Sequence, residues 1–156
     1  MSMKMSKNNG FTLLEVMIAV FVLGIGLLGL AHLQTTSLKH NESAYLRTQA
    51  SSLASDIFDR MRANQTAAKA GNYNLSVADD APVSPSTMAD MDISEWLSNM
   101  TVFLPGSDGA INCNDSDATD SFSCSEGSIF TVTVEWSEVQ QDGGRGISSF
   151  IYSGAL

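Results

Sequence analysis

The second half of this chain has almost no positive charge. Residues 71–156 contain thirteen Asp and Glu against one cation, Arg145, whereas residues 1–70 contain the other seven Lys and Arg and four acids. Such an acidic surface repels phosphate backbones, so we expect no nucleic acid among its partners. It favours a solvated extracytoplasmic domain, because high net charge keeps a domain soluble. The length of 156 residues allows one such domain with a helical extension, not two full cores.

Cysteine is also scarce, with two residues in the whole chain. The two cysteines, Cys113 and Cys124, lie in a polar, loop-like stretch that has no histidine. Two thiols alone make a poor metal site, so an oxidised pair in a secreted domain is the favoured interpretation. Closing this loop would contribute on the order of 3 kcal/mol to stability.

Catalytic motifs are missing as well. There is no GxSxG, HExxH or phosphate loop, and His32 and His40 lie far in sequence from the cysteines. The acids Asp115, Asp117 and Asp120 suggest calcium, but Asp120 occupies the position at which an EF-hand loop requires glycine. We expect no enzyme, no cofactor and no metal, with a calcium-binding or adhesion-ligand module tethered to a membrane as an alternative.

The chain does contain a long apolar run near its start. Residues 11–31 read FTLLEVMIAVFVLGIGLLGLA, about the 20 residues that a helix needs to cross a bilayer. Residues 1–10 carry Lys4 and Lys7 without an acid, which suits the cytoplasmic side of a membrane. Glu15 is the only charge in the run, and an acid within a bilayer costs about 2.5–3.5 kcal/mol. Such a residue usually has a partner and a function.

Two ordinary explanations account for part of this pattern. Gly29-Leu30-Ala31 is similar to the cleavage site of a secretory signal, but the apolar region is too long for one and contains an acid near its start. A plain transmembrane anchor explains the length and leaves Glu15 without a reason.

A third explanation comes from Gly10-Phe11-Thr12-Leu13-Leu14-Glu15, which resembles the processing motif of type IV prepilins and related pseudopilins. The resemblance implies cleavage after Gly10 by a prepilin peptidase and N-methylation of the new amine of Phe11. The apolar run would stay in the mature protein. The implied fold is α+β and type IV pilin-like: a long N-terminal helix packed on a small antiparallel sheet.

The charge of Glu15 then has two candidate partners. Cleavage creates a cationic amine at Phe11, one helical turn before Glu15 and near the positive end of the helix. In a filament the carboxylate would meet the Phe11 amine of a neighbouring subunit, which cancels two charges that are costly in an apolar core and sets the register. Pairing within one subunit at the helix end is the alternative.

Three glycines, Gly24, Gly26 and Gly29, interrupt the apolar run. They permit close helix packing in membranes. The resemblance to pilins offers a second interpretation, since part of this segment can lose helicity in a pilus. Both interpretations stay open.

A second helical pattern follows the membrane segment. One apolar stripe recurs at three- and four-residue spacing and is expected to pack on the head. Asp56 with Arg60 and Asp59 with Arg62 are favourable helical ion pairs. A continuous helix to Arg62 would be roughly 78 Å long. The expected divisions are a leader at 1–10, a transmembrane part at 11–31, an amphipathic part at 32–64 and a head at 65–156. The stripe comprises Leu46, Ala50, Leu53, Ala54, Ile57, Phe58 and Met61.

The head shows one more helix and a hairpin. Residues 71–86 read as a connecting loop, and Thr87 with Asp90 is typical of a helix cap that precedes a helix ending before Pro105. Residues 129–136 alternate as a half-buried strand, whose partner is expected at 147–152 after a Gly-Gly turn.

Residues 25–34 (IGLLGLAHLQ) and 55–64 (SDIFDRMRAN) are similar to the minor-pilin family of the type IV pilus modification protein PilV. Weaker similarity extends to TVTVEW at 131–136. This implies a non-enzymatic subunit of the bacterial inner membrane with a periplasmic head, which joins other minor pilins and the major pilin in a priming or tip complex. It would support pilus biogenesis, motility or adhesion. A pseudopilin of type II secretion shares the N-terminal motif and is the nearest alternative.

Overall fold

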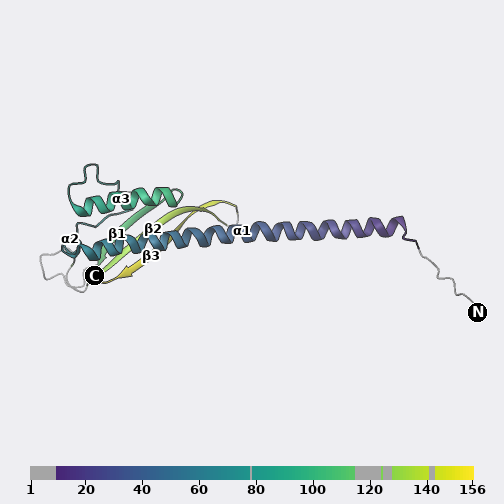
Figure 1. The fold of residues 1–156 in the computed structure, drawn as a ribbon, viewed down its shortest axis with the longest axis horizontal. Helices are drawn as coiled ribbons and strands as arrows, with labels where there is room; N and C mark the ends of the chain where they lie inside the picture. The colour runs from purple at the N-terminus through teal and green to yellow at the C-terminus, as the bar shows by residue number, and fades with distance from the viewer. Residues whose placement is uncertain (1–9, 78, 115–123, 125–127, 141–142) are drawn as a thin grey trace, which may run out of the picture. The chain divides into compact units, whose positions relative to one another are not determined.

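The computed structural model describes residues 10–77, 79–114, 124, 128–140 and 143–156. Six elements follow one another in the order α1, α2, α3, β1, β2 and β3 (Figure 1). The chain divides into two compact units, Met1–Asn41 and Glu42–Leu156, and helix α1 (Leu13–Ala63) contributes to both. Apart from Gly10, the expected leader lies outside the described residues.

The first unit is a bare apolar helix. All of its described residues are exposed, and an 18-residue window of α1 reaches a mean hydropathy of 2.6 with no part of it buried. By length and composition this helix can cross a bilayer. It remains helical through Gly24, Gly26 and Gly29, and a Cβ placed on any of them would meet no described atom within 4 Å beyond the adjoining residues and helix backbone. Both interpretations of these glycines therefore remain predictions.

In the second unit, the C-terminal part of α1 provides the centre of the core. Its buried side chains are the seven of the predicted stripe, so that prediction is confirmed. Spacings of three and four residues place them on one side of the helix, where burial removes apolar surface from water. A short helix, α2 (Gln65–Lys69), follows directly.

Helix α3 (Met88–Phe103) begins and ends where the sequence predicted. The Thr87 hydroxyl accepts a hydrogen bond from the Asp90 N–H at 3.1 Å, and the Asp90 carboxylate accepts one from the Thr87 N–H at 3.0 Å. These bonds satisfy N–H groups that a helix start leaves without partners. The Trp96 indole N–H donates to the Leu53 carbonyl at 2.9 Å, which fastens α3 to α1.

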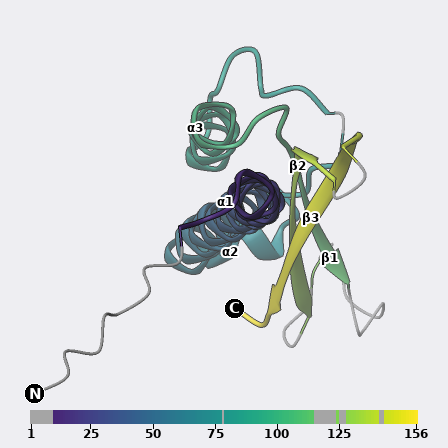
Figure 2. The ribbon, with the colours of Figure 1, turned by 90° about the vertical axis from the view of Figure 1, so that its right-hand side faces the viewer.

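The sheet is antiparallel and has the order β1-β2-β3, with β1 at Asp108–Asn114, β2 at Ile129–Val139 and β3 at Arg145–Gly154. The predicted hairpin of β2 and β3 is confirmed. Alternate side chains of β2 face the core, and α3 and the sheet lie on different sides of α1 (Figure 2). The α+β fold, a long apolar helix on a small antiparallel sheet, is the one that the sequence predicted. The core-facing residues of β2 are Phe130, Val132, Val134 and Trp136.

Two loop predictions are wrong in part. Cys113 lies in β1, and Leu75, within the predicted 71–86 loop, forms an antiparallel bridge with Ile111 of β1. The strand escaped prediction because Ile111 is its only large apolar residue. Gly109 faces the core instead of a larger side chain, since a Cβ there would lie 2.5 Å from the Trp96 ring.

Candidate functional site

The predicted processing residues lie at the start of α1. Gly10 and Phe11 precede the helix, and Phe11 is 83% exposed. Apart from the adjoining residues, no atom of the described chain lies within 4 Å of a Cβ placed on Gly10. The bond between these two residues therefore lies in an exposed, non-helical part of the described chain, where a peptidase can reach it.

Thr12 directly precedes the first helical residue, Leu13, and its capping role was not predicted from the sequence. Its carbonyl accepts hydrogen bonds from the N–H groups of Glu15 at 3.1 Å and Val16 at 3.3 Å, and its hydroxyl lies 3.3 Å from the Glu15 nitrogen. This is the geometry of an N-cap. The signal was present in the sequence, because Thr-x-x-Glu is the pattern of a capping box.

Glu15 is exposed on the first turn of α1. Within the described part of the chain, its carboxylate makes no hydrogen bond or ion pair. Phe11, Glu15 and Ala19 line one open, mainly apolar groove along the helix. The position near the helix N-terminus favours a negative charge through the helix dipole. The carboxylate is thus available for a partner that is not provided by the described residues.

A polar cluster that the sequence did not predict joins α1 to α3. The two predicted ion pairs are present, Arg60–Asp56 at 3.1 Å and Arg62–Asp59 at 3.4 Å. Arg60 also binds two acids of α3, Glu95 at 2.8 Å and Asp92 at 3.3 Å. These hydrogen bonds, that to Glu95 foremost, raise the pKa of Arg60, and the Arg60 hydrogen bond lowers the pKa of Glu95.

Asp92 is the buried centre of this cluster. It is 9% exposed and accepts a hydrogen bond from the hydroxyl of Tyr73, which is fully buried. The amide of Asn64 donates to the same hydroxyl at 3.2 Å. Burial, together with the bond to Asp92, raises the pKa of Tyr73 to about 12. The sequence signal was an acid on the apolar face of α3, between Ala89 and Trp96.

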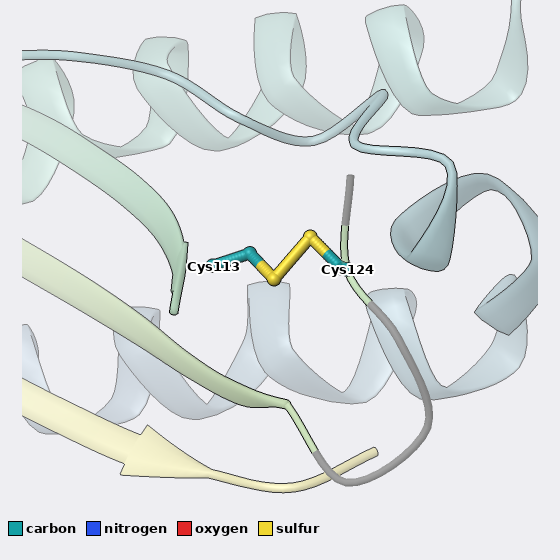
Figure 3. Close-up of a disulfide and its surroundings, with 2 residues drawn as sticks. All are labelled: Cys113 and Cys124. Atoms are coloured by element: carbon teal, nitrogen blue, oxygen red, sulfur yellow. A yellow bond between two sulfur atoms is a disulfide. The ribbon is translucent and has the colours of Figure 1, made fainter. Parts of the chain in front are cut away.

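The predicted disulfide is present between Cys113 and Cys124, whose Cα atoms are 6.0 Å apart (Figure 3). It connects the C-terminal part of β1 to a segment near α2, where the Cys124 N–H donates to the Lys69 carbonyl at 3.2 Å. Cys124 is fully buried. The disulfide therefore links β1 to a residue that is hydrogen-bonded to the last residue of α2.

The other residues considered from the sequence add no site. Asp115, Asp117 and Asp120 lie outside the described residues. His32 and His40 are exposed on α1. In the described parts of the chain, no group of three or more His, Cys, Asp or Glu is placed to hold a metal ion.

Comparison with known proteins gives a finding for the start of α1. Residues 5–31 match the family model of the prokaryotic N-terminal methylation motif. The match supports a type IV prepilin-like protein. It covers Gly10, Phe11, Thr12 and Glu15 together with the apolar part of α1. No curated protein and no solved structure matches the chain in these comparisons.

The prepilin-like motif and the exposed apolar helix are consistent with each other. The match continues into the apolar part of α1, and residues 10–41 are all exposed. Together they fit a membrane-anchored, pilin-like subunit.

Proposed function

We propose that this chain is a minor pilin, most similar to the PilV family, that takes part in type IV pilus assembly. The observation that carries the proposal is the methylation motif at the start of an exposed apolar run, residues 11–31, whose one acid is Glu15. In this role it joins other minor pilins and the major pilin in a priming or tip complex. It thereby supports pilus biogenesis, motility or adhesion.

Each residue of the motif has a part in this proposal. Prepilin peptidase cleaves after Gly10 at the inner membrane and releases the amine of Phe11, which is then N-methylated. The amine remains cationic, and Glu15 of an adjacent subunit neutralises it during assembly. Two charges that are each unfavourable in an apolar environment are stable there as a pair. The pair forms in only one axial position, so it sets the register between helices.

The head has a structural role in the same proposal, without catalysis. It faces the periplasm before assembly and the cell surface afterwards. The disulfide between Cys113 and Cys124 suits that oxidising location. The acidic surface of residues 71–156 keeps the head soluble while α1 is held in the membrane or filament.

Mass spectrometry of the intact protein from native membranes tests processing and methylation together. We expect a chain that begins at N-methylated Phe11, and a Gly10→Ala variant that retains the leader. A native chain that begins at Met1 or at His32 would contradict the proposal, because these ends correspond to a plain anchor and to a cleaved secretory signal.

A deletion strain separates the pilus from type II secretion. Loss of the protein should reduce surface pili and motility, and expression of the wild-type chain should restore both. Normal pili together with a defect in protein secretion would instead favour a pseudopilin.

A further inference from the structure

Among the residues that the structure describes, one edge of the head's sheet is partly covered and the other is left bare. At the β1 edge, Ile111 exchanges two backbone hydrogen bonds with Leu75, each 2.9 Å long. At the opposite edge, β2 is the only strand of the described chain that pairs with β3. Over the described residues, no backbone hydrogen bond joins residues 145–154 to any element other than β2.

The backbone groups at the bare edge follow from the alternation of antiparallel pairs. Ile111 bonds to Leu75 on its outer side, so the Ile111–Val132 pair lacks backbone hydrogen bonds and Val132 bonds to β3 instead. The Ser137 N–H supports this alternation, because it donates to the Pro105 carbonyl at 2.8 Å and therefore points away from β3. The β3 partners of Thr131, Thr133, Glu135 and Ser137 therefore direct their N–H and C=O groups outward. These partners are Ser153, Ile151, Ser149 and Ile147.

This edge lacks the features that normally prevent strand addition. At ten residues, β3 is longer than an average strand of about five or six. It contains neither proline nor lysine, and its one charge, Arg145, is its first residue. Ile147 and Ile151 are 74% and 60% exposed. A long, unbroken and apolar edge is a template for another strand unless a partner covers it.

The core also continues toward this edge, where the Tyr152 ring meets that of Phe58 of α1 with centroids 5.0 Å apart. Phe150 and Tyr152, on the inner face of β3, are only half-buried. A fourth strand would place its inner side chains beside these two rings and its outer ones beside Ile147 and Ile151. Both faces of the incoming strand would then gain apolar contacts in addition to the backbone ladder.

We propose that the β3 edge binds an extended segment of a different protein chain, which adds as a fourth strand. Only an extended backbone presents donors and acceptors at the spacing of the four outward residues. A second copy is disfavoured, because residues 71–156 carry thirteen acids against Arg145 and two such heads repel each other. The occupant is therefore a segment without net negative charge, rich in β-branched residues. This surface belongs to the head alone, so it does not depend on the proposed role in a pilus.

Residue-specific amide exchange in the full chain, purified in detergent micelles, tests both the geometry and the binding. Without a partner, the amides of Ile147, Ser149 and Ile151 should exchange faster than those of Ser148 and Phe150. The probe is a synthetic peptide of alternating threonine and valine with lysine at both ends. When nine-tenths of the protein is bound, the outward amides should exchange about tenfold more slowly.

Ser149→Pro removes one outward N–H at an edge position where proline is tolerated. It should weaken peptide binding by about three- to tenfold, whereas Ser149→Ala, which retains the N–H, should bind like the wild type. Should Ser149→Pro fail to fold, Ile151→Lys places a charge at the same edge and should weaken binding likewise. A peptide with glutamate ends should bind more weakly than the lysine peptide, and this difference should shrink at high salt.

Three outcomes would overturn the inference. The first is peptide binding that leaves the outward amides unprotected, or no binding at all. The second is equal binding by the Ser149→Pro and Ser149→Ala variants. The third is protection of these amides that rises with protein concentration in the absence of peptide, because it would assign the edge to a second copy. None of these results depends on whether Phe11 is methylated.

Discussion

Glu15 is the residue on which the proposed assembly role depends. Its backbone N–H is capped by Thr12, whereas its side chain has no partner among the described residues. The local structure thus explains why the helix begins here, but it does not explain why the third helical residue should carry a charge. A glutamine would fit the same helix turn, and this difference allows a test.

Glu15→Gln should insert into the membrane normally and yet be recovered in sheared pili at about one-tenth of the wild-type level. The tenfold reduction corresponds to the loss of one charge-assisted hydrogen bond. Immunoblots of the membrane and sheared fractions provide the ratio. Glu42→Gln, an exposed acid on α1 beyond the apolar run, is the matched control and should incorporate normally. Equal recovery of both variants would exclude a pairing role for Glu15.

Asp92 and Asp59 carry the same charge in different surroundings. Asp92 is buried between Arg60 and Tyr73, whereas the side chain of Asp59 is 73% exposed and contacts Arg62. Water screens the exposed pair, so it contributes little. The buried acid binds two donors in a region where an unpaired polar group is costly.

Asp92→Asn should therefore lower the free energy of unfolding by about 1–3 kcal/mol, and Asp59→Asn by less than about 1 kcal/mol. Urea denaturation followed by tryptophan fluorescence reports on both, because Trp96 and Trp136 are fully buried. Equal effects of the two substitutions would show that the cluster does not hold α3 on α1.

At the scale of elements, α3 depends on its cap for its position. The lowered pKa of Asp90, caused mainly by the backbone N–H of Thr87 and then by that of Ser86, reflects the same hydrogen bonds that begin the helix. The same helix is held on α1 by the hydrogen bond from the Trp96 indole N–H to the Leu53 carbonyl. Loss of the cap should affect the packing of the whole helix.

Thr87→Ala should cost about 1 kcal/mol of stability, because it removes the hydroxyl that caps Asp90. Thr101→Ala, near the other end of α3, changes an exposed residue and should stay within about 0.5 kcal/mol of the wild type. Thermal unfolding followed by circular dichroism compares the two. A larger effect at Thr101 would contradict the importance of the cap.

At the scale of the whole molecule, one covalent bond and one buried phenol respond to solution conditions. The disulfide joins residues 11 apart in sequence and so restricts the unfolded chain. Reduction should lower the free energy of unfolding by about 3 kcal/mol. Urea titrations with and without reductant measure this difference, and a Cys113→Ala/Cys124→Ala double variant should not respond to reductant. Unchanged stability of the wild type on reduction would contradict the expected contribution.

Stability should also decline in alkali because of Tyr73. Its pKa is about 12 in the folded chain against an ordinary value of 10.0, so the unfolded chain loses the phenolic proton first. The contribution is fully present below pH 10 and is lost as pH rises toward about 12. Tyr73→Phe should flatten the decline in unfolding free energy over this range, whereas Tyr45→Phe, at an exposed position, should preserve it. An equal slope in both variants would contradict the assignment.

The parts of the fold that could be predicted from the residues are those whose signals are local. The apolar run, the stripe from Leu46 to Met61 and the cap at Thr87 each depend on residues within a few positions of one another. The hairpin of β2 and β3 was predictable for the same reason, because its alternation and its turn adjoin. The prepilin-like motif is likewise contiguous. The periodic patterns among them can be recognised in the sequence because the buried faces of helices and strands repeat every 3.6 and 2 residues.

Contacts between distant segments became known only from the folded chain. The bridge of Leu75 with Ile111, the strand that holds Cys113 and the contact of Arg60 with Asp92 join residues that no local period relates. Glycine is needed at position 109 of β1 because the Trp96 ring occupies the space that a Cβ would need. The edge position of β3 could not be predicted either, because it depends on which strands pair with β3 in the folded chain. Local periodicity determines which face of an element is buried, but steric fit and the pairing of buried polar groups determine what covers that face.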